Sequence, residues 1–169
     1  MESNLTLSFG FKGQLELKAQ AVPLQEGYLK VGVIVASTET NGLAFGKVVS
    51  AAPATADTFT AGIGSGNVIR GICVFDDAIA QNAPAHPNSY LPGFPCAALN
   101  HGFLWLNGWT KSATAAIDPA IGCKVIAKDA DGTVEFLAAT GSAPEGWTEL
   151  TNASVRDVDA DNGALIYLA

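Results

Sequence analysis

Residues 5–21, LTLSFGFKGQLELKAQA, carry the clearest periodicity of the chain. Apart from Gly10 and Gly13, which mark a bend, polar or charged side chains occupy the even positions and apolar ones the odd positions. The apolar set is Leu5, Leu7, Phe9, Phe11, Leu15, Leu17, Ala19 and Ala21. Because successive side chains of a strand point to opposite faces, this period of two predicts strands with one buried face. Residues 1–11 could equally form an extended arm that lies across a neighbouring subunit.

Short apolar runs separated by turn residues continue the pattern along the chain. Asn-Gly and Asp-Gly pairs between such runs are strong hairpin signals, because their backbone conformations match the twist of the flanking strands. The predicted elements are hairpins over 29–49 (turn Asn41-Gly42), 96–106 (turn Asn100-His101-Gly102) and 120–138 (turn Asp131-Gly132), single strands over 68–75 and 164–168, and a loop or edge over 50–67.

Residues 76–95 have a different character. Asp76–Asn82 could begin a short helix with an Asp cap, and four prolines then hold an extended loop that contains Tyr90 and Phe94. No segment carries a stripe of 3.6-residue period longer than two turns. The sequence therefore predicts one mainly β domain over 1–169: a small β-barrel or β-sandwich of antiparallel hairpins, with a long Pro-rich loop and at most one short helix.

Composition excludes several classes of protein. The 169 residues are 49% hydrophobic and 15% charged, with a net charge of −7, which argues against a disordered chain and against binding to nucleic acid or an anionic membrane. The charges of residues 1–128 cancel, so the eight acidic residues and Arg156 of residues 129–169 account for the net charge. The low charge fits either a bland surface or one covered by partner subunits, and both readings stay open.

The cysteines and the N-terminus indicate where the chain folds. Cys73, Cys96 and Cys123 are widely spaced in apolar settings, so we expect buried free thiols and a reducing cytoplasm. The first residues lack the basic-then-apolar pattern of a signal peptide.

No motif predicts catalysis, a cofactor or a metal site. Residues 157–163 resemble a Ca²⁺ loop, but the glycine is in seventh place and the twelfth residue is Leu168; an acidic turn is favoured over a cation site. We expect structural roles for the remaining candidates, which are His86, His101, the pair Asp76-Asp77 and the glycine-rich run 62–66. Trp105 is expected in the core, whereas Trp109 and Trp147 could be exposed and line a sugar-binding surface; core or interface packing is favoured.

Three ordered stretches resemble the capsid cement, or decoration, proteins of tailed bacteriophages. They are VIRGICVFDD (68–77), SYLPGFPCAALNHGFLWL (89–106) and AIDPAIGCKVIAKDADGTV (116–134). The positions that match the family are Tyr90, Gly93, Gly102, Trp105, Gly122, Val125 and Gly132. The chain departs from the family at Phe94-Pro95-Cys96, where a polar residue more often follows the glycine, and in its own loop over 76–89.

The resemblance implies a non-enzymatic structural protein of the virion. Such a protein is made in the bacterial host cytoplasm, binds the outer surface of the assembled major capsid protein shell, and stabilises the joints between capsomers, commonly as a homo-oligomer (a dimer or a trimer). We expect contact through the arm and through two loop aromatics, with the acidic C-terminal quarter facing solvent. The predicted contact residues are Leu5, Leu7, Phe9, Phe11, Tyr90 and Phe94.

Two alternatives remain at this stage. One is another virion-associated β-module, from a tail or a fibre. The other is a carbohydrate-binding module that uses exposed tryptophan.

Overall fold

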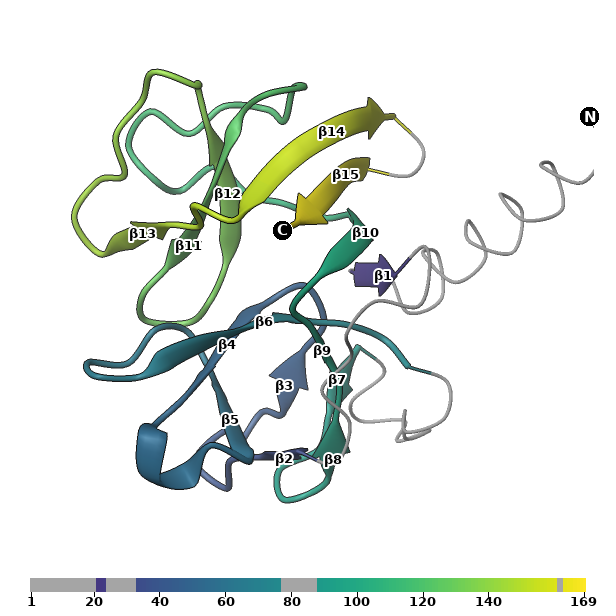
Figure 1. Ribbon diagram of the computed structural model, residues 1–169, viewed down its shortest axis with the longest axis vertical. Helices are drawn as coiled ribbons and strands as arrows, with labels where there is room; N and C mark the ends of the chain where they lie inside the picture. The colour runs from purple at the N-terminus through teal and green to yellow at the C-terminus, as the bar shows by residue number, and fades with distance from the viewer. Residues whose placement is uncertain (1–20, 24–32, 77–87, 161–162) are drawn as a thin grey trace, which may run out of the picture.

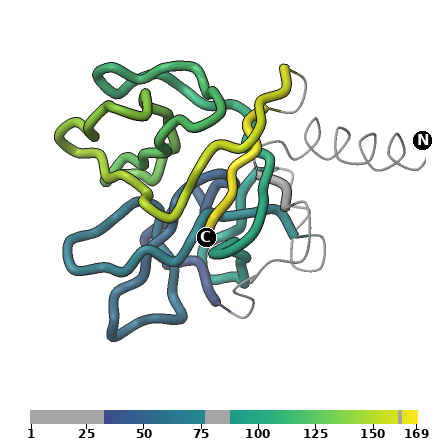
Figure 2. Tube along the Cα trace, turned by 45° about the horizontal axis from the view of Figure 1, so that its top comes forward, coloured from purple at the N-terminus to yellow at the C-terminus, as the bar shows by residue number. Residues whose placement is uncertain are grey.

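The computed structural model describes residues 21–23, 33–76, 88–160 and 163–169, and these residues form a mainly β structure. The predicted fold class is confirmed: short, mostly antiparallel strands dominate, and the described helical content is the single 3-10 turn η1 (Pro53–Thr55). Strands β2 to β9 form one half of the molecule, and β1 and β10 to β15 form the other (Figures 1 and 2). Within the described residues, no helix is long and apolar enough to cross a membrane.

The first half is built around a six-stranded sheet that curls into a barrel-like shape (Figure 1). Its strands, in spatial order, are β8 (Pro95–Cys96), β2 (Val33–Val35), β5 (Thr58–Ala61), β4 (Val48–Ala51), β6 (Val68–Cys73) and β9 (Ala98–Leu99). Strand β2 runs parallel to β5, and the other neighbours in this sheet are antiparallel. A two-stranded sheet of β3 (Leu43–Ala44) and β7 (Ser89–Tyr90) lies beside it.

The second half contains two antiparallel sheets. One has the order β1 (Ala21–Pro23), β10 (Gly102–Leu106), β15 (Gly163–Leu168) and β14 (Ala153–Asp159). The other has the order β12 (Val134–Leu137), β11 (Lys124–Lys128) and β13 (Trp147–Glu149).

One contiguous cluster of buried side chains joins the two halves. It contains Phe59 and Tyr90 from the first half and Phe136 and Ile166 from the second, all fully buried. Strand β10 shows how period-two patterning produces this core, because Leu104 and Leu106 point inward while the residues between them remain half-buried. Trp105 is one of those half-buried residues, so its predicted place in the core is wrong.

The predicted hairpin over 29–49 is wrong in its pairing. The turn exists, since Gly42 has φ +78 and its N–H donates to the Glu39 carbonyl at 2.7 Å. However, β3 after the turn pairs with β7, and β2 before it pairs with β5 and β8. A Cβ at residue 42 would lie 2.5 Å from the Tyr90 carbonyl oxygen. The absence of a side chain at Gly42 therefore allows β7, and not β2, to lie against the turn.

The predicted hairpin over 96–106 is also wrong. Strand β9 pairs with β6, whereas β10 pairs with β1 and β15 in the other half. The chain therefore passes between sheets at Asn100-His101 instead of reversing within one sheet. Residues 50–67, expected as a loop or edge, contain the strand β5 inside the six-stranded sheet.

The third predicted hairpin and the closing strand are confirmed. Strands β11 and β12 pair antiparallel around Gly132, which has φ +70, and β15 closes the chain. Strands β13 and β14 are additional elements that the sequence patterns did not reveal. The predicted helix start at 76–82 and the predicted arm fall almost entirely outside the described residues.

Candidate contact surfaces and hollows

The six predicted contact residues have different outcomes. The four in the arm (Leu5, Leu7, Phe9 and Phe11) lie outside the described residues. Tyr90 is completely buried: its hydroxyl donates to the Val74 carbonyl at 2.8 Å and accepts from the Asp76 N–H at 3.0 Å. Burial, with neighbouring Cys73, raises the pKa of this hydroxyl, so it stays protonated. Tyr90 is therefore a core residue of this subunit, not a surface one.

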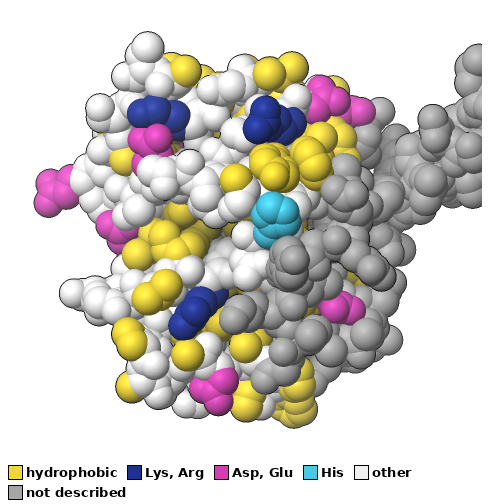
Figure 3. All heavy atoms as spheres, in the orientation of Figure 1, with side chains coloured by type: hydrophobic (Ala, Val, Ile, Leu, Met, Phe, Trp, Pro, Cys, Tyr) yellow, Lys and Arg dark blue, Asp and Glu magenta, His cyan; other side chains and the backbone are white. Residues whose placement is uncertain are grey.

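Phe94 lies on the surface, as a contact residue must. Its side chain is 48% exposed, and its carbonyl accepts a hydrogen bond from Val35 N at 3.0 Å, which fixes the loop against β2. Ile34 of β2 is 41% exposed and pairs in register with Pro95, so both lie on the same face. We call Ile34, Phe94 and Pro95 the β2–β8 patch. Hydrophobic side chains gather over β2 and β8 at the lower end of the face in Figure 3.

The exposure of Ile34 in this patch is not recognisable from the sequence. This residue lies in the unbroken apolar run Val31–Ala36, where a period of two cannot be recognised. The structure separates the run into buried Val33 and Val35 and exposed Ile34.

A second surface feature is an aromatic cluster on the outward side of β10 and β15. The rings of Phe103 and Tyr167 are 4.7 Å apart between centroids, and the Arg156 guanidinium lies 5.3 Å from the Tyr167 ring centroid. The exposed ring of His101 lies 6.0 Å from Tyr167, and it is visible beside hydrophobic side chains in Figure 3.

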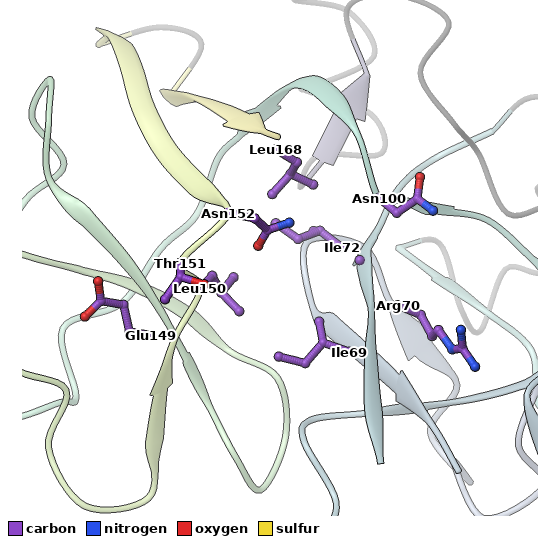
Figure 4. Close-up of a pocket in the computed structure, with 10 residues that line it drawn as sticks. Ile69, Arg70, Ile72, Asn100, Glu149, Leu150, Thr151, Asn152 and Leu168 are labelled. Carbon is purple, nitrogen blue, oxygen red and sulfur yellow. The ribbon is translucent and has the colours of Figure 1, made fainter. Parts of the chain in front are cut away.

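A hollow of about 450 Å³ lies between β6 and the turn after β13. Ile69, Ile72, Leu150 and Leu168 converge on it, with Asn152 beside them (Figure 4). We call this hollow the β6 groove.

The second hollow, about 350 Å³, lies beside Trp109. Lys47 and Lys128 also line it, and the Lys47 ammonium lies 3.7 Å from the Asp131 carboxylate. Trp147 packs elsewhere, against the small cluster that contains Ile126, whereas Trp109 packs on the main core. The structure therefore does not bring the two tryptophans onto one surface.

Glu135 is a buried charged residue that the sequence patterns did not indicate. It is fully buried, although it belongs to the acidic quarter predicted to face solvent, and that prediction is wrong for this residue. Its carboxylate accepts hydrogen bonds from Thr110 Oγ1 (2.8 Å), Ser112 N and Oγ (2.8 and 2.6 Å) and Ala113 N (2.8 Å). Burial opposes ionisation, but these donors outweigh it and lower the pKa of Glu135. The carboxylate thus holds in place the loop that carries Trp109. In the sequence, the single acidic residue within the otherwise apolar run 134–137 is the signal that could have indicated a buried Glu135.

The cysteines and the acidic residues of β14 are further candidates that the structure describes. Cys73, Cys96 and Cys123 are buried free thiols, as predicted. Burial raises the pKa of Cys96 to about 12, and the pKa of Cys73 is also raised, chiefly by burial. No group of three or more His, Cys, Asp or Glu side chains in the described ranges could hold a metal ion. Asp157 and Asp159 lie at the end of β14, next to the turn of the β14–β15 hairpin.

The fold resembles that of a known capsid component. A chain of "The capsid of Myoviridae Phage XM1" superposes with a TM-score of 0.54 at 16% identity, covering 85% of this chain and 83% of that one. No curated protein matches the sequence. At this level of identity the likeness is one of fold: this β-rich fold is shared with a chain of a phage capsid structure.

The family follows from the whole chain. Residues 2–169 match the model of the structural cement protein family described by E217 gp24 and Pam3 gp6. The chain belongs to this family, which confirms the resemblance seen in the sequence.

Proposed function

We propose that this protein binds the outer surface of the assembled major capsid protein shell and stabilises the joints between capsomers. Its membership of the structural cement family supports a capsid role. The observation that carries the proposal further is the β2–β8 patch, where Ile34 of β2 and Phe94, the residue before β8, are 41% and 48% exposed.

The energy of such a contact fits a cement protein. Full burial of a Phe or Ile side chain contributes about 1.5–3 kcal/mol, so one small patch binds weakly. Repetition over a shell multiplies such contacts, and avidity can exceed the affinity of each one by about 10²–10⁴. A weak but repeated contact needs no deep pocket.

The arm is the second proposed contact element. Its apolar side chains, Leu5, Leu7, Phe9 and Phe11, alternate with small polar ones, as in a strand that covers one apolar face. We place the protein on the virion surface after synthesis in the host cytoplasm, as a dimer or trimer. Its three buried free thiols are compatible with folding in a reducing compartment.

Co-sedimentation with assembled shells tests the patch. A variant with Ile34→Ser and Phe94→Ser is expected to lose at least tenfold in shell occupancy. The matched control is Ile121→Ser, because Ile121 is 72% exposed but lies outside the patch. Equal occupancy for the double variant and the wild type would remove the patch from the proposal.

Two further comparisons test the role itself. Binding to expanded shells but not to unexpanded precursors is expected if the protein recognises joints of the mature lattice. Deletion of residues 1–11 is expected to lower occupancy, and unchanged binding would exclude the arm as a contact element.

The carbohydrate-binding alternative has weaker support. Trp109 borders a hollow, but Trp147 is packed in a different cluster, so the paired aromatic platform is missing from the described residues. Glycan-array binding that disappears in Trp109→Ala would favour this alternative.

A further inference from the structure

The β6 groove lies along a strand that is only partly paired. Strand β6 pairs with β4 from Val68 to Ile72, but on its other side β9 reaches only Ile72 and Cys73. Among the described strands, none pairs with Val68–Arg70 on that side. An unpaired edge presents backbone N–H and C=O groups that another strand can bind.

The exposed side chains along this edge are apolar. Val68 is 48% exposed and Ile69 is 37% exposed, and these two are among the few large hydrophobic side chains left on the described surface. Ile69 forms one wall of the groove, and Leu150 and Leu168, which are nearly buried, form the opposite side. Exposed apolar groups beside an open edge favour pairing with a further strand.

The two faces of this edge differ in chemistry. Ile69 and Ile72 point into the groove, whereas Arg70 and Asn100 point to the other side of β6 (Figure 4). Arg70 Nε and Asn100 Oδ1 are buried and have no hydrogen-bond partner in the described structure. The groove face thus leaves Ile69 partly exposed, without an apolar cover among the described residues. On the other face of the described structure, Arg70 Nε–H lacks an acceptor and Asn100 Oδ1 lacks a donor.

A strand that complements both faces must alternate apolar with hydroxyl side chains. Residues 5–9 do so: Leu5, Leu7 and Phe9, with Phe11 beyond Gly10, would cover the groove, and Thr6 and Ser8 would lie on the opposite face. A hydroxyl group both donates and accepts, so it suits an unpartnered Nε–H and an unpartnered amide oxygen. Residues 5–11 also carry no charge, which suits a groove whose described borders carry one charge of each sign, Arg70 on the far side of β6 and Glu149.

We propose that residues 5–11 of one copy bind the β6 groove of a second copy as an added strand. Within one chain the segment would have to reverse direction to reach the groove, because Ala21 pairs with Leu106 and β1 already runs from that end of β10 toward Asn100. The contact links neighbouring subunits, and it rests on the proposed role of residues 1–11 as a contact segment. The proposed occupant of the open β6 edge is therefore a second copy of the chain.

A complementation experiment without shells tests the inference. One variant lacks residues 1–11 but keeps its groove; the other keeps the segment and carries Ile69→Lys in the groove. Sedimentation velocity is expected to show self-association of the wild type, at least tenfold weaker self-association for each variant alone, and a heterodimer when the two are mixed. Ile121→Lys is the matched control, because Ile121 is exposed outside the groove and should associate as the wild type does.

Several outcomes would overturn the inference. A wild type that remains monomeric, a deletion variant that still self-associates, or a mixture that fails to form the heterodimer would each do so. Circular dichroism of both variants establishes that they are folded, which is expected because Ile69 is 37% exposed. Since no shell is present, failure here leaves the β2–β8 patch to be judged by co-sedimentation alone.

A peptide provides an independent measurement. Residues 2–12 as a synthetic peptide should bind the deletion variant, detected by fluorescence anisotropy, and should not bind it when Ile69→Lys is added. A peptide of the same composition with the alternation broken is the matched control. Equal binding of the two peptides would show that period-two complementarity plays no part.

Discussion

The buried carboxylate of Glu135 accepts hydrogen bonds from both the N–H and the hydroxyl of Ser112, at 2.8 and 2.6 Å. These two residues lie 23 positions apart, and the contact fixes the loop after β10 onto β12. The buried charge is stabilised because Thr110, Ser112 and Ala113 all donate hydrogen bonds to the carboxylate.

Glu135→Gln should destabilise the fold. The neutral amide loses the charge-assisted hydrogen bonds and places two donors where the carboxylate had acceptors, so we expect a loss of about 2–3 kcal/mol. Urea unfolding measures this loss. Glu145→Gln, at an exposed position, is the control and should change stability by less than about 0.5 kcal/mol.

The same residue predicts a pH dependence. Because the pKa of Glu135 is lowered by folding, its contribution is complete above the ordinary Glu pKa of about 4.3 and is lost as the pH falls through the lowered value. The stability difference between wild type and Glu135→Gln should therefore be constant from pH 7 to pH 5 and shrink below about pH 4. A difference that grows toward low pH would contradict a lowered pKa.

Gly132→Ala tests the contact between the β11–β12 hairpin and β4. Gly132 has φ +70, and a Cβ there would lie 2.2 Å from the Val48 carbonyl oxygen. Gly146→Ala is the matched control, since Gly146 has φ +77 but nothing within 4 Å. We expect about 1–2 kcal/mol of destabilisation for Gly146→Ala from backbone strain alone, and a clearly larger loss for Gly132→Ala in the same thermal unfolding assay.

Tyr90→Phe separates a core role from a contact role. Removing the hydroxyl leaves the Val74 carbonyl and the Asp76 N–H without this partner, at a cost of about 1–3 kcal/mol. Shell occupancy measured below the unfolding temperature should nevertheless equal that of the wild type. Reduced shell occupancy at unchanged stability would show that Tyr90 contributes to the contact with the shell.

Thiol labelling tests the burial of the cysteines. Cys73 and Cys96 have raised pKa values because they are buried, so few thiolates form at neutral pH and a disulfide reagent should react slowly with the native protein. All three thiols, including Cys123, should react quickly after denaturation in guanidinium chloride. Fast labelling of native Cys73 or Cys96 would show that the core around β6 and β8 opens readily.

Local signals in the sequence predicted some elements well. The β11–β12 hairpin was predictable because Asp131-Gly132 encodes a reversal and the two apolar runs beside it are long enough to pair. The closing strand and the buried thiols were predictable for the same reason, since each depends on residues adjacent in the chain.

Other elements could not be predicted from local signals. Asn41-Gly42 encodes a turn, but the turn does not determine which strand pairs next: Leu43 pairs with Tyr90, 47 residues later. Ile34 and Phe94 form a patch only because β2 and β8 are neighbours across the sheet. The acceptors of Glu135 are likewise matched with donors on a distant loop.

The chain by itself determined the β class, the family and the alternation of apolar side chains, because side-chain period and turn chemistry are local properties. Tertiary structure decided which strand edges are paired, which stay open, and which apolar residues remain on the surface. Backbone hydrogen bonds are the same for any sequence, so the choice of strand partner depends on how distant side chains pack. The open edge of β6 is one such outcome, and the alternating residues 5–11 acquire a proposed binding site only once that edge is known.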